Sequence, residues 1–319
     1  MPKAASRNTA VVVCSDRNWA FQALFLLSRL RASDMHSRLD YYYYSPDIPA
    51  GRLLDLINQV GSFVQSAPVN LAYPTSGHIP AAAYLRLDAI NDLAQRYSRV
   101  IYLDADIFLD HGSIADLAEV PLTDRPLAAV RDWIQWRTDG PRWFRHSYYP
   151  QIVPSGGGYF NSGLLVVNSE NFRAHGIAEA SHKFLTDRPE LCKYHDQTAL
   201  NAVVNGDWDE LSPVWNWQLK PKNAFALDSR RPRLIHTVGG IKPWNDAFRL
   251  LPSRFDLTMR AYFASVGLAA EYSAVWPDTY SRPAEAQRAK KLSRQPHDYQ
   301  VLNSKMVAYL DRTDFVGPL

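Results

Sequence analysis

The chain has 319 residues, with 35 basic and 32 acidic side chains, so its formal net charge at pH 7 is only +3. A nucleic-acid-binding protein would need a strong basic excess, and this near balance therefore argues against a nucleic-acid partner. Hydrophobic residues make up 46% of the chain and charged residues 21%, the profile of a globular protein with a sizeable core. The two cysteines, Cys14 and Cys192, are too few for a disulfide framework and favour a reducing compartment.

The N-terminal residues carry no pattern of an export signal or a membrane anchor. The apolar run 10–14 is shorter than the apolar region of a signal peptide, and Asp16 follows it closely. No stretch approaches the ~20 consecutive apolar residues of a membrane-spanning helix. The sequence therefore predicts a soluble, cytoplasmic protein.

Predicted strands and helices alternate over the first hundred residues. The run 10–15 is short, continuous and rich in β-branched residues, which is typical of a buried strand. Residues 18–33 have the apolar spacing of a helix, and Asn18 is expected to cap it. Further strands are predicted at 39–45 and 100–103, and further helices at 50–60 and 79–97. This alternation indicates an α/β fold with a mostly parallel central sheet and flanking helices.

The second half of the chain is less regular. Residues 131–158 are rich in Trp, Tyr and Arg without a clear period, and we expect a long irregular insertion there. Strand character returns at 159–172, two helices are expected at 175–188 and 195–206, and 231–244 is expected to form a short strand and a glycine-rich loop. The composition shifts again after about residue 265. We therefore expect a main domain at 1–265 and a C-terminal helical appendage at 266–319.

Two carboxylates, Asp104 and Asp106, directly follow the predicted strand 100–103. At positions i and i+2 of an extended chain they point to the same side, where they repel each other unless water or a cation compensates them. Carboxylate oxygens suit Mg²⁺ or Mn²⁺, and such an ion can hold a diphosphate. Ligands of open α/β sheets also bind beyond the carboxyl ends of strands. The position and the chemistry favour a metal site, with a solvated turn as the alternative.

Four groups of motifs carry a resemblance to a known family. They occur in the order AYLRLDAI with RVIYLDADIF, YFNSGLLVVNSENFR, HDQTALN and IHTVGGIKPW. Together they resemble family 8 of the retaining glycosyltransferases, which includes bacterial lipooligosaccharide galactosyltransferases and the glycogenins. The resemblance covers about residues 10–244 and implies a GT-A (nucleotide-diphospho-sugar transferase) fold for a catalytic domain at 1–265. It implies transfer of a hexose, galactose or glucose, from a UDP-sugar to a glycan or lipid-linked saccharide acceptor.

The resemblance implies a Mn²⁺ site formed by Asp104, Asp106 and His236. Mg²⁺ is the alternative ion, but an imidazole ligand suits Mn²⁺ better. A histidine such as His236 would by itself be interpreted as a packed core residue, and its place before TVGGIKPW favours the metal role.

Further residues are expected around the diphosphate. Lys242 resembles the family's diphosphate lysine, because an ammonium group suits a phosphate oxygen. Gly239 and Gly240 would let the backbone approach the phosphates, with a plain surface loop as the alternative. Arg86 resembles a basic residue near the diphosphate and donor sugar, its alternative being a solvated helix arginine. Ala105, between the two aspartates, belongs to the same nucleotide-binding set.

The segment CSDRNWA resembles the nucleoside-binding end of the family's first strand. The resemblance implies that the backbone of Cys14 and the side chains of Asp16 and Asn18 face the uridine. Trp19 stands where the family commonly has Tyr, which keeps an aromatic face for the uracil and loses a hydroxyl. The alternative is that Asn18 only caps a helix and Trp19 belongs to the core.

A last set of residues is expected to face the sugars. Asn161, Asp196 and Gln197 resemble the family's sugar-facing residues, and Asp132 matches a position near both sugars. Thr198 replaces an acid that family members often have, so a carboxylate role at 198 is in doubt. Retaining hydrolases use a carboxylate nucleophile, whereas Gln197 is a poor one. We therefore expect a same-face mechanism in which Gln197 and Asp196 stabilise an oxocarbenium-like sugar.

Two segments have less specific interpretations. The insertion 131–158 is a candidate acceptor site whose aromatic side chains stack on sugar faces, the alternative being that they pack on one another; they are Trp133, Trp136, Trp143, Tyr148 and Tyr149. In the appendage, the basic run with Lys290, Lys291 and Arg294 fits either a peripheral membrane contact at the inner face of the membrane or a solvated charge run.

Two rival functions remain open at this point. A UDP-sugar-binding protein without turnover would have the same motifs, and Thr198 leaves room for it. A Mg²⁺-dependent phosphotransferase of the haloacid dehalogenase type also uses Asp-x-Asp after a strand, usually the first strand of the chain. Here the pair lies after residue 100, which disfavours that alternative.

Overall fold

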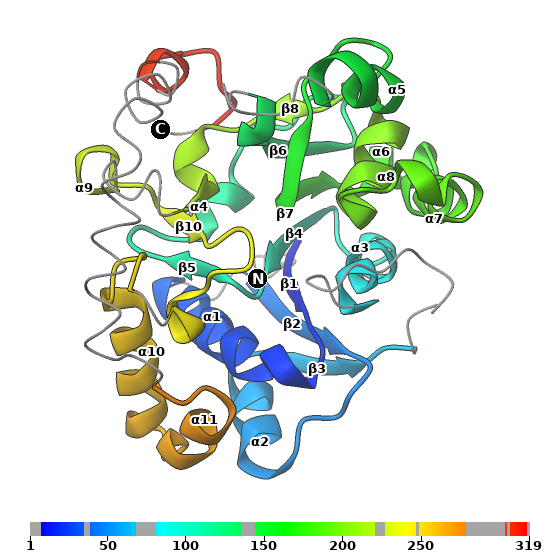
Figure 1. Ribbon diagram of the computed structural model, residues 1–319. Coiled ribbons are helices and arrows are strands. Elements are labelled where there is room, and N and C mark those ends of the chain that lie inside the picture. Colours follow the sequence, from blue (N-terminus) through cyan, green and yellow to red (C-terminus); the bar gives the residue numbers. More distant parts are fainter. Residues whose placement is uncertain are drawn as a thin grey trace, which may run out of the picture.

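A seven-stranded mixed sheet forms the centre of the molecule (Figure 1). The computed structural model describes residues 8–34, 39–67, 81–135, 144–220, 227–246, 249–278, 304 and 307–317. The strand order is β3-β2-β1-β4-β7-β6-β8. The bounds are β1 Thr9–Cys14, β2 Leu39–Ser45, β3 Ser62–Gln65, β4 Arg99–Asp104, β6 Leu127–Arg131, β7 Phe160–Asn168 and β8 Asp209–Glu210. Only β7 runs antiparallel to its neighbours in this sheet, so the predicted mostly parallel α/β sheet is confirmed.

Alternate residues of the central strands enter two separate hydrophobic cores, one on each face of the sheet. Val11 and Val13 of β1 belong to the first core, whereas Ala10 and Val12 belong to the second. The same alternation holds in β4. A strand that is apolar on both faces must be covered by helices on both faces, which explains the continuous apolar runs in the sequence.

Helices α1 (Ala20–Ser33), α2 (Gly51–Val60), α10 (Arg254–Ser265) and α11 (Ala269–Val275) cover the first face. Helices α3 (Leu85–Ala94), α6 (Ser169–Ala174), α7 (Ile177–Asp187) and α8 (His195–Val204) cover the second (Figure 1). The short helices are α4 (Ala115–Ala118), α5 (Tyr149–Ile152) and α9 (Leu227–Arg230).

A second, three-stranded sheet, which was not predicted from the sequence, lies beside the carboxyl end of β4. Its order is β5-β10-β9, with β5 at Ile107–Leu109, β10 at Leu234–His236 and β9 at Trp217–Gln218. The chain enters β5 directly after the turn at 105–106. The antiparallel pairing of β5 with β10 places His236 opposite Ile107, next to the two aspartates.

Several predicted elements differ in detail from the observed ones. The helix predicted at 18–33 begins as a single 3-10 turn, Arg17–Trp19, and Asp16 rather than Asn18 caps that turn. The strand predicted at 159–172 ends at Asn168, whose side chain accepts a hydrogen bond from the backbone of Asn171 and starts α6. Such capping by a short polar side chain overrides the strand propensity of the residues around it.

The insertion 131–158 is not irregular throughout, because its described residues form short helices. These are a 3-10 turn at Trp133–Gln135, a π-helical stretch at Phe144–Tyr148 and α5. Residues 136–143 lie outside the described ones. Tyr148, Phe144 and Tyr159 form a small third core, which holds this segment against α8.

The chain beyond residue 265 packs on the main domain wherever it is described. Leu268 and Tyr272, at the start of and within α11, lie in the same core as α1 and α10. Residues 307–317, here called the C-terminal segment (red in Figure 1), reach the edge strand β8, where Val316 pairs with Leu211. The basic run 282–295 lies outside the described residues, so its membrane contact stays a prediction.

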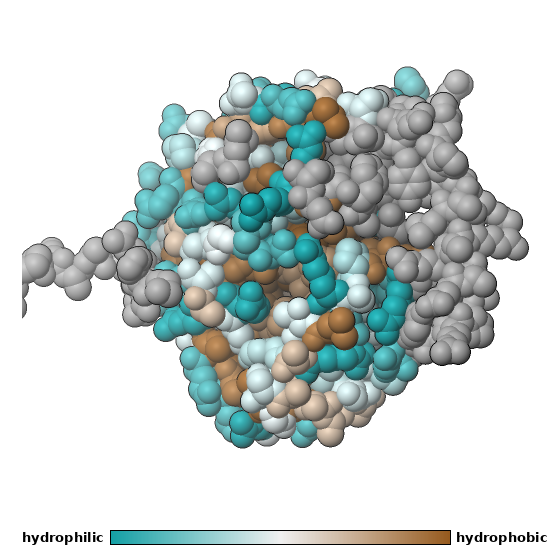
Figure 2. Space-filling model, turned by 90° about the vertical axis from the view of Figure 1, so that its left-hand side faces the viewer, coloured by the Kyte–Doolittle hydropathy of each residue, from teal (hydrophilic) through white to brown (hydrophobic). Residues whose placement is uncertain are grey.

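Hydrophobic side chains on the face shown in Figure 2 occur in small groups among hydrophilic ones. The large hydrophobic residues that are exposed in the described part are Ile48, Ile241, Leu257 and Val275. Within the described ranges, every helix is too short or too polar to cross a bilayer.

Candidate active site

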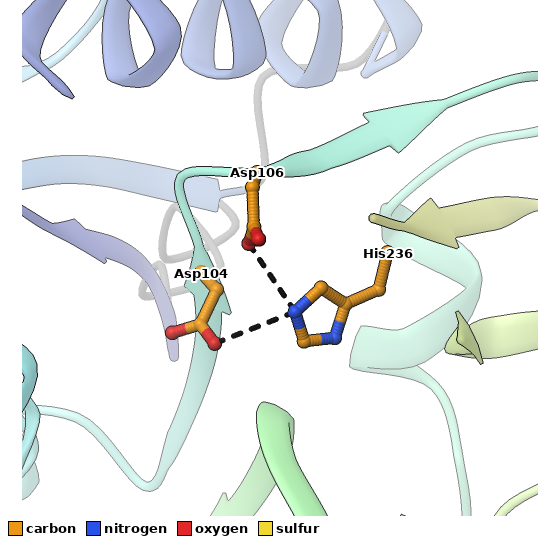
Figure 3. A group of neighbouring side chains, drawn as sticks. All are labelled: Asp104, Asp106 and His236. Atoms are coloured by element: carbon orange, nitrogen blue, oxygen red, sulfur yellow. Dashed lines mark ion pairs between the residues drawn. The ribbon is translucent and has the colours of Figure 1, made fainter. Parts of the chain in front are cut away.

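Asp104, Asp106 and His236 converge beyond the carboxyl end of β4 (Figure 3). Their ligand atoms all lie within 4.8 Å of one another. The Nε2 atom of His236 is 3.2 Å from a carboxylate oxygen of Asp106 and 3.7 Å from one of Asp104. The two aspartates do not lie on one extended strand as expected: β4 ends at Asp104, and the chain turns at Ala105–Asp106. This turn directs both carboxylates toward the imidazole from β10.

The second oxygen of Asp104 is held by neighbouring side chains. The Tyr102 hydroxyl donates to Asp104 Oδ1 at 2.7 Å, and Arg86 Nη2 lies 2.9 Å from the same atom. Asp104 Oδ2 is left facing His236. The carboxylate is thereby oriented with one oxygen toward the protein and one toward the cluster.

Asp106 is oriented in the same manner by Lys242. The Lys242 ammonium donates to Asp106 Oδ2 and to the backbone oxygen of Thr237, while Asp106 Oδ1 faces His236. Burial alone would raise the pKa of Asp106, but the ammonium of Lys242 and the hydrogen-bond contacts with Lys242 and His236 outweigh burial and hold that pKa well below its usual range. The Asp106 carboxylate is therefore ionised at any physiological pH. Lys242 itself is 8% exposed and lines the cavity described below.

Arg86 is buried between two carboxylates rather than solvated on its helix. Its Nε atom lies 2.8 Å from Asp196, its Nη2 atom 2.9 Å from Asp104, and its side chain is 7% exposed. The Arg86 Nη1 atom also donates to the backbone and hydroxyl oxygens of Ser162, at 2.7 Å and 2.8 Å. Burial raises the pKa of Asp196 to about 6, although the Arg86 charge opposes this. Arg86 thus links the cluster of Asp104 to the amino-terminal turn of α8.

Gln197, Asn161 and Asp132 form one hydrogen-bonded network. Gln197 Oε1 accepts hydrogen bonds from Asn161 Nδ2 and from the backbone of Ser162, both at 3.1 Å. Gln197 Nε2 donates to Asp132 Oδ2 at 3.0 Å, and Asn161 Nδ2 donates to the same oxygen at 3.1 Å. The backbone of Ile134 donates to Asp132 Oδ1 at 2.8 Å. Because Gln197 Oε1 faces two N–H donors and Gln197 Nε2 faces a carboxylate oxygen, only this orientation of the Gln197 amide satisfies all three hydrogen bonds.

One cavity of about 450 Å³ collects the predicted site residues, with a single exception. Its lining includes Cys14, Asp16, Trp19, Arg86, Asp104, Ala105, Asp106, Asp132, Asn161, Asp196, Gln197, His236, Gly239 and Lys242. Asn18 does not line it and is exposed. The cavity size suits a ligand of a few hundred daltons, such as a nucleotide. Residues that are far apart in the sequence, from Cys14 to Lys242, therefore line the same cavity.

Trp19, which lines the cavity just after β1, belongs to an aromatic cluster that extends behind the cavity wall. The rings of Trp19 and Trp244 meet edge to face with centroids 5.2 Å apart, and Trp276 lies 6.4 Å from Trp19. The Lys242 ammonium lies 5.6 Å from the centroid of the Trp19 ring. Trp19 is only partly buried, so it is both a core-packing residue and a cavity wall, as the two interpretations of the sequence allowed.

The glycine pair of the loop after β10 forms an open part of the wall. Gly239 has φ +91°, a conformation that side chains rarely adopt, and a Cβ atom at Gly240 would meet nothing within 4 Å. The backbone here is accessible, as a close approach of a ligand requires.

The aromatic residues of the insertion have different positions. Trp133 lines the cavity, with the Lys220 ammonium 5.4 Å from its ring centroid. Tyr148 is buried, donates to the backbone oxygen of Leu191 at 2.6 Å, and shares a hydrogen bond with Thr198. Tyr149 packs on Phe144. Burial in the third core makes the prediction of sugar stacking wrong for Tyr148. Tyr149 is half-buried against that core, so stacking stays a prediction for it, and Trp136 and Trp143 lie outside the described residues.

Some residues of the site were not identified from the sequence. Gly163 is one of them: a Cβ atom on it would lie 2.2 Å from Cε1 of His236, so only glycine leaves room for the ring. Asn216 is another, since it contacts both His236 and Asn161. The FNSG motif was a signal for Gly163, whereas no sequence pattern around Asn216 pointed to the site. Other unforeseen cavity-lining residues are Ser15, Ala83, Tyr102, Ile134, Ser162, Tyr194, Gln218, Lys220 and Val238.

The donor set of the cluster fits a divalent metal ion. Each carboxylate has one oxygen bound to the protein and the other, Asp104 Oδ2 or Asp106 Oδ1, turned toward the Nε2 atom of His236. Two carboxylate oxygens and one imidazole nitrogen are ligands that Mn²⁺ accepts. Among the described residues, this is the group of three or more ligand side chains close enough to hold an ion.

Comparison with known sequences is consistent with this arrangement. The sequence model of glycosyl transferase family 8 matches residues 10–247. General stress protein A of Bacillus subtilis is 35% identical over 189 residues, covering 53% of this chain and 61% of that protein. Lipopolysaccharide 1,2-glucosyltransferase of Escherichia coli K12 is 28% identical over 173 residues, 51% of this chain and 49% of that protein. Lipopolysaccharide 1,3-galactosyltransferase of Salmonella typhimurium is 26% identical over 183 residues, 54% and 52% of the two chains. The matches thus span about half to three fifths of these relatives.

Comparison with solved structures identifies the fold. The galactosyltransferase LgtC, solved with donor and acceptor sugar analogues, has a TM-score of 0.63 and 21% identity and matches 81% of this chain and 99% of its own. The glycosyltransferase GlyE of Streptococcus pneumoniae has a TM-score of 0.54 and 17% identity, matching 86% of this chain and 66% of its own. The predicted GT-A fold is therefore confirmed.

Proposed function

Because the chain belongs to glycosyl transferase family 8, we propose that it moves a hexosyl group from a UDP-sugar to a hydroxyl of a saccharide or glycolipid acceptor, with retention and with Mn²⁺. The observation that supports this best is the meeting of Asp104, Asp106 and His236 with Asp196 and Gln197 in one cavity. The first group suits a metal-bound diphosphate, and the second suits a sugar beside it.

The names of the relatives favour glucose or galactose as the transferred sugar. Two of them are lipopolysaccharide glucosyl- and galactosyltransferases, and LgtC is a galactosyltransferase. A saccharide attached to a lipid is accordingly our first choice of acceptor. The family membership gives no support to the phosphotransferase alternative.

Asp104, Asp106 and His236 are the residues that would hold the cation. When bound, the cation would supply positive charge to the diphosphate as the bond to the sugar breaks. Lys242 would add a second positive charge, because its ammonium lies at the cavity wall on the Asp106 side. Its present partners are Asp106 and a backbone oxygen.

Gln197 would face the sugar as a polar group and not as a nucleophile. Its Oε1 atom already accepts two hydrogen bonds, and its nitrogen is turned to Asp132. Both oxygens of Asp132 also accept hydrogen bonds. This supports a same-face reaction, in which the C1–O bond to the phosphate breaks, the acceptor oxygen bonds to C1, and its proton passes to a phosphate oxygen of the departing UDP.

The test is UDP release from a panel of UDP-sugars with and without a saccharide acceptor, in Mn²⁺ or in EDTA. Asp106→Asn keeps the shape of the side chain and removes its charge, and we expect it to abolish release. Asp187→Asn, at the exposed end of α7, is the matched control and should behave as the wild type.

Metal-dependent release from one sugar, lost in Asp106→Asn alone, would establish the proposed activity and identify the donor. A UDP-sugar-binding protein without turnover would show Mn²⁺-dependent binding of UDP in calorimetry but no release with any acceptor. Absence of UDP binding would overturn both alternatives.

A further inference from the structure

Asn216 connects the predicted metal ligand His236 with the predicted sugar-facing residue Asn161. It lies directly before β9, the neighbour of β10, and is 1% exposed. Its Oδ1 atom is 3.0 Å from Nδ1 of His236, and its Nδ2 atom donates to Oδ1 of Asn161 at 2.9 Å. This one buried amide therefore links a predicted metal ligand to a predicted sugar-facing residue.

The orientation of the Asn161 amide follows from its fixed partners. The backbone N–H of Gly163, which can only donate, lies 3.0 Å from Asn161 Oδ1. The Asp132 carboxylate lies 3.1 Å from Asn161 Nδ2. A reversed amide would face a donor with its nitrogen and a carboxylate with its oxygen, so this orientation is the one that satisfies both ends.

The Asn216 orientation follows from that of Asn161. Since Asn161 presents an oxygen, Asn216 must present its amide nitrogen to it, and its own oxygen must then face His236. An amide oxygen only accepts hydrogen bonds. The Nδ1 atom of His236 must therefore carry a proton, which leaves the lone pair of a neutral ring on Nε2, the atom that faces Asp104 and Asp106.

We propose that Asn216 is a positioning residue that holds His236 in the tautomer and ring orientation needed to bind a divalent cation. This inference rests on the proposed metal-dependent function. Groups that orient a ligating histidine typically contribute 10- to 100-fold to metal affinity. The same side chain holds Asn161, so the position of the cation-binding ring and that of the Gln197 network depend on each other.

Two substitutions separate the two contacts. Asn216→Ala removes the acceptor for His236 and the donor for Asn161. Asn216→Asp keeps an acceptor for His236 Nδ1 but places a carboxylate against the oxygen of Asn161. Asn201→Ala is the matched control, because Asn201 is also 1% exposed and uses both ends of its amide, with the backbone of Phe160 and Gln197.

The readouts are the tautomer of His236 and the affinity for Mn²⁺. Long-range ¹H–¹⁵N spectra of the histidine rings, at a pH where His236 is neutral, report the tautomer, and loss of the signal in His236→Asn assigns it. Electron paramagnetic resonance of free Mn²⁺, titrated with protein in the presence of UDP, reports the affinity. Thermal unfolding of each variant checks that it folds.

We expect an Nδ1–H tautomer in the wild type, in Asn216→Asp and in Asn201→Ala. Asn216→Ala should show mixed tautomers and bind Mn²⁺ roughly 10-fold more weakly or worse. Asn216→Asp should keep its Mn²⁺ affinity and have a lower kcat at saturating Mn²⁺.

An Nε2–H tautomer in the wild type would overturn the proposal, as would an Asn216→Ala variant with unchanged tautomer and affinity. If the wild type did not bind Mn²⁺ with UDP, the metal-dependent function would fail. The tautomers of the wild type and Asn216→Ala would then still decide whether Asn216 orients His236.

Discussion

Individual residues of the site are oriented by hydrogen bonds that leave few alternatives. The Gln197 amide accepts two hydrogen bonds on its oxygen and donates one from its nitrogen to Asp132. Arg86 is held between Asp104 and Asp196 in the same manner. Fixed dipoles of this kind stabilise a developing charge without having to reorganise. Single substitutions of these residues should therefore lower kcat more than they weaken ligand binding.

Replacement of Gln197 by Ala should lower kcat roughly 100-fold, the usual effect of removing one preorganised polar group, while UDP affinity is unchanged. Single-turnover kinetics and calorimetry with UDP would measure the two effects. Gln95→Ala, at the exposed end of α3, is the control. A loss of UDP affinity together with kcat would show that Gln197 has another role.

The pKa of Asp196 predicts a pH dependence of stability. Burial raises this pKa from 3.8 to about 6, so the folded state retains the proton at a pH where the unfolded chain has lost it. The stabilisation is fully present below pH ~4 and is lost as the pH rises through ~6, by up to about 3 kcal/mol for a fully buried group. In denaturant titrations, the free energy of unfolding of the wild type should fall over this range relative to that of Asp196→Asn. Parallel curves for the two proteins would contradict the raised pKa.

At the scale of elements, the site depends on how closely β7 approaches β10. Gly163 of β7 provides the space for the His236 ring, and its backbone N–H donates to Asn161. Because Gly163 has no side chain, the His236 ring of β10 can lie directly against the backbone of β7. The two sheets therefore share one tightly packed junction.

A methyl group at this junction should displace His236. We expect Gly163→Ala to lower the free energy of unfolding by about 1–3 kcal/mol through overpacking and to weaken Mn²⁺ binding roughly 10-fold. Gly240→Ala, where a Cβ atom meets open space, should unfold at the wild-type temperature. Thermal unfolding and Mn²⁺ titration would measure both effects. Unchanged Mn²⁺ affinity in Gly163→Ala would show that the ring can shift without loss.

In the molecule as a whole, the C-terminal segment is attached at β8, which pairs with the strand that ends just before Asp132. Tyr309 donates to Glu210 Oε1 at 2.5 Å, and Arg312 lies 3.2 Å from Glu210 Oε2. Arg131, the last residue of β6, lies 2.7 Å from the same carboxylate, and this pairing lowers the pKa of Glu210 against the opposing effect of burial. The segment from the distant end of the chain is thus tied to the residue that precedes Asp132.

Phe315 is the buried aromatic anchor of this segment, packing edge to face on Tyr309 with centroids 5.2 Å apart. Phe315→Ala should lower the free energy of unfolding by about 3 kcal/mol, as for other buried aromatic truncations. Thr313→Ala, at an exposed position of the same segment, should have no effect. Denaturant unfolding would measure both variants, and a wild-type value for Phe315→Ala would mean that the segment is not part of the cooperative fold.

Local sequence patterns are enough to predict the α/β alternation, the central strands and the site motifs. These are local properties. A continuous apolar run such as 10–14 indicates a strand that is buried on both faces. The Asp-x-Asp motif at the end of the strand 100–103 indicates a ligand site. The residues that the family pattern predicted for the site line one cavity, except Asn18, which is exposed in the turn that Asp16 caps.

The small sheet, the space at Gly163 and the bridge through Asn216 become visible only in the folded chain. Strands of two or three residues, such as β9 and β10, carry too little periodicity to be predicted. Contacts such as that between Asn216 and His236 join residues 20 positions apart, and no local preference encodes them. The physical reason is that a buried polar side chain is defined by the partners that satisfy its hydrogen bonds, and those partners are brought together only by the complete fold.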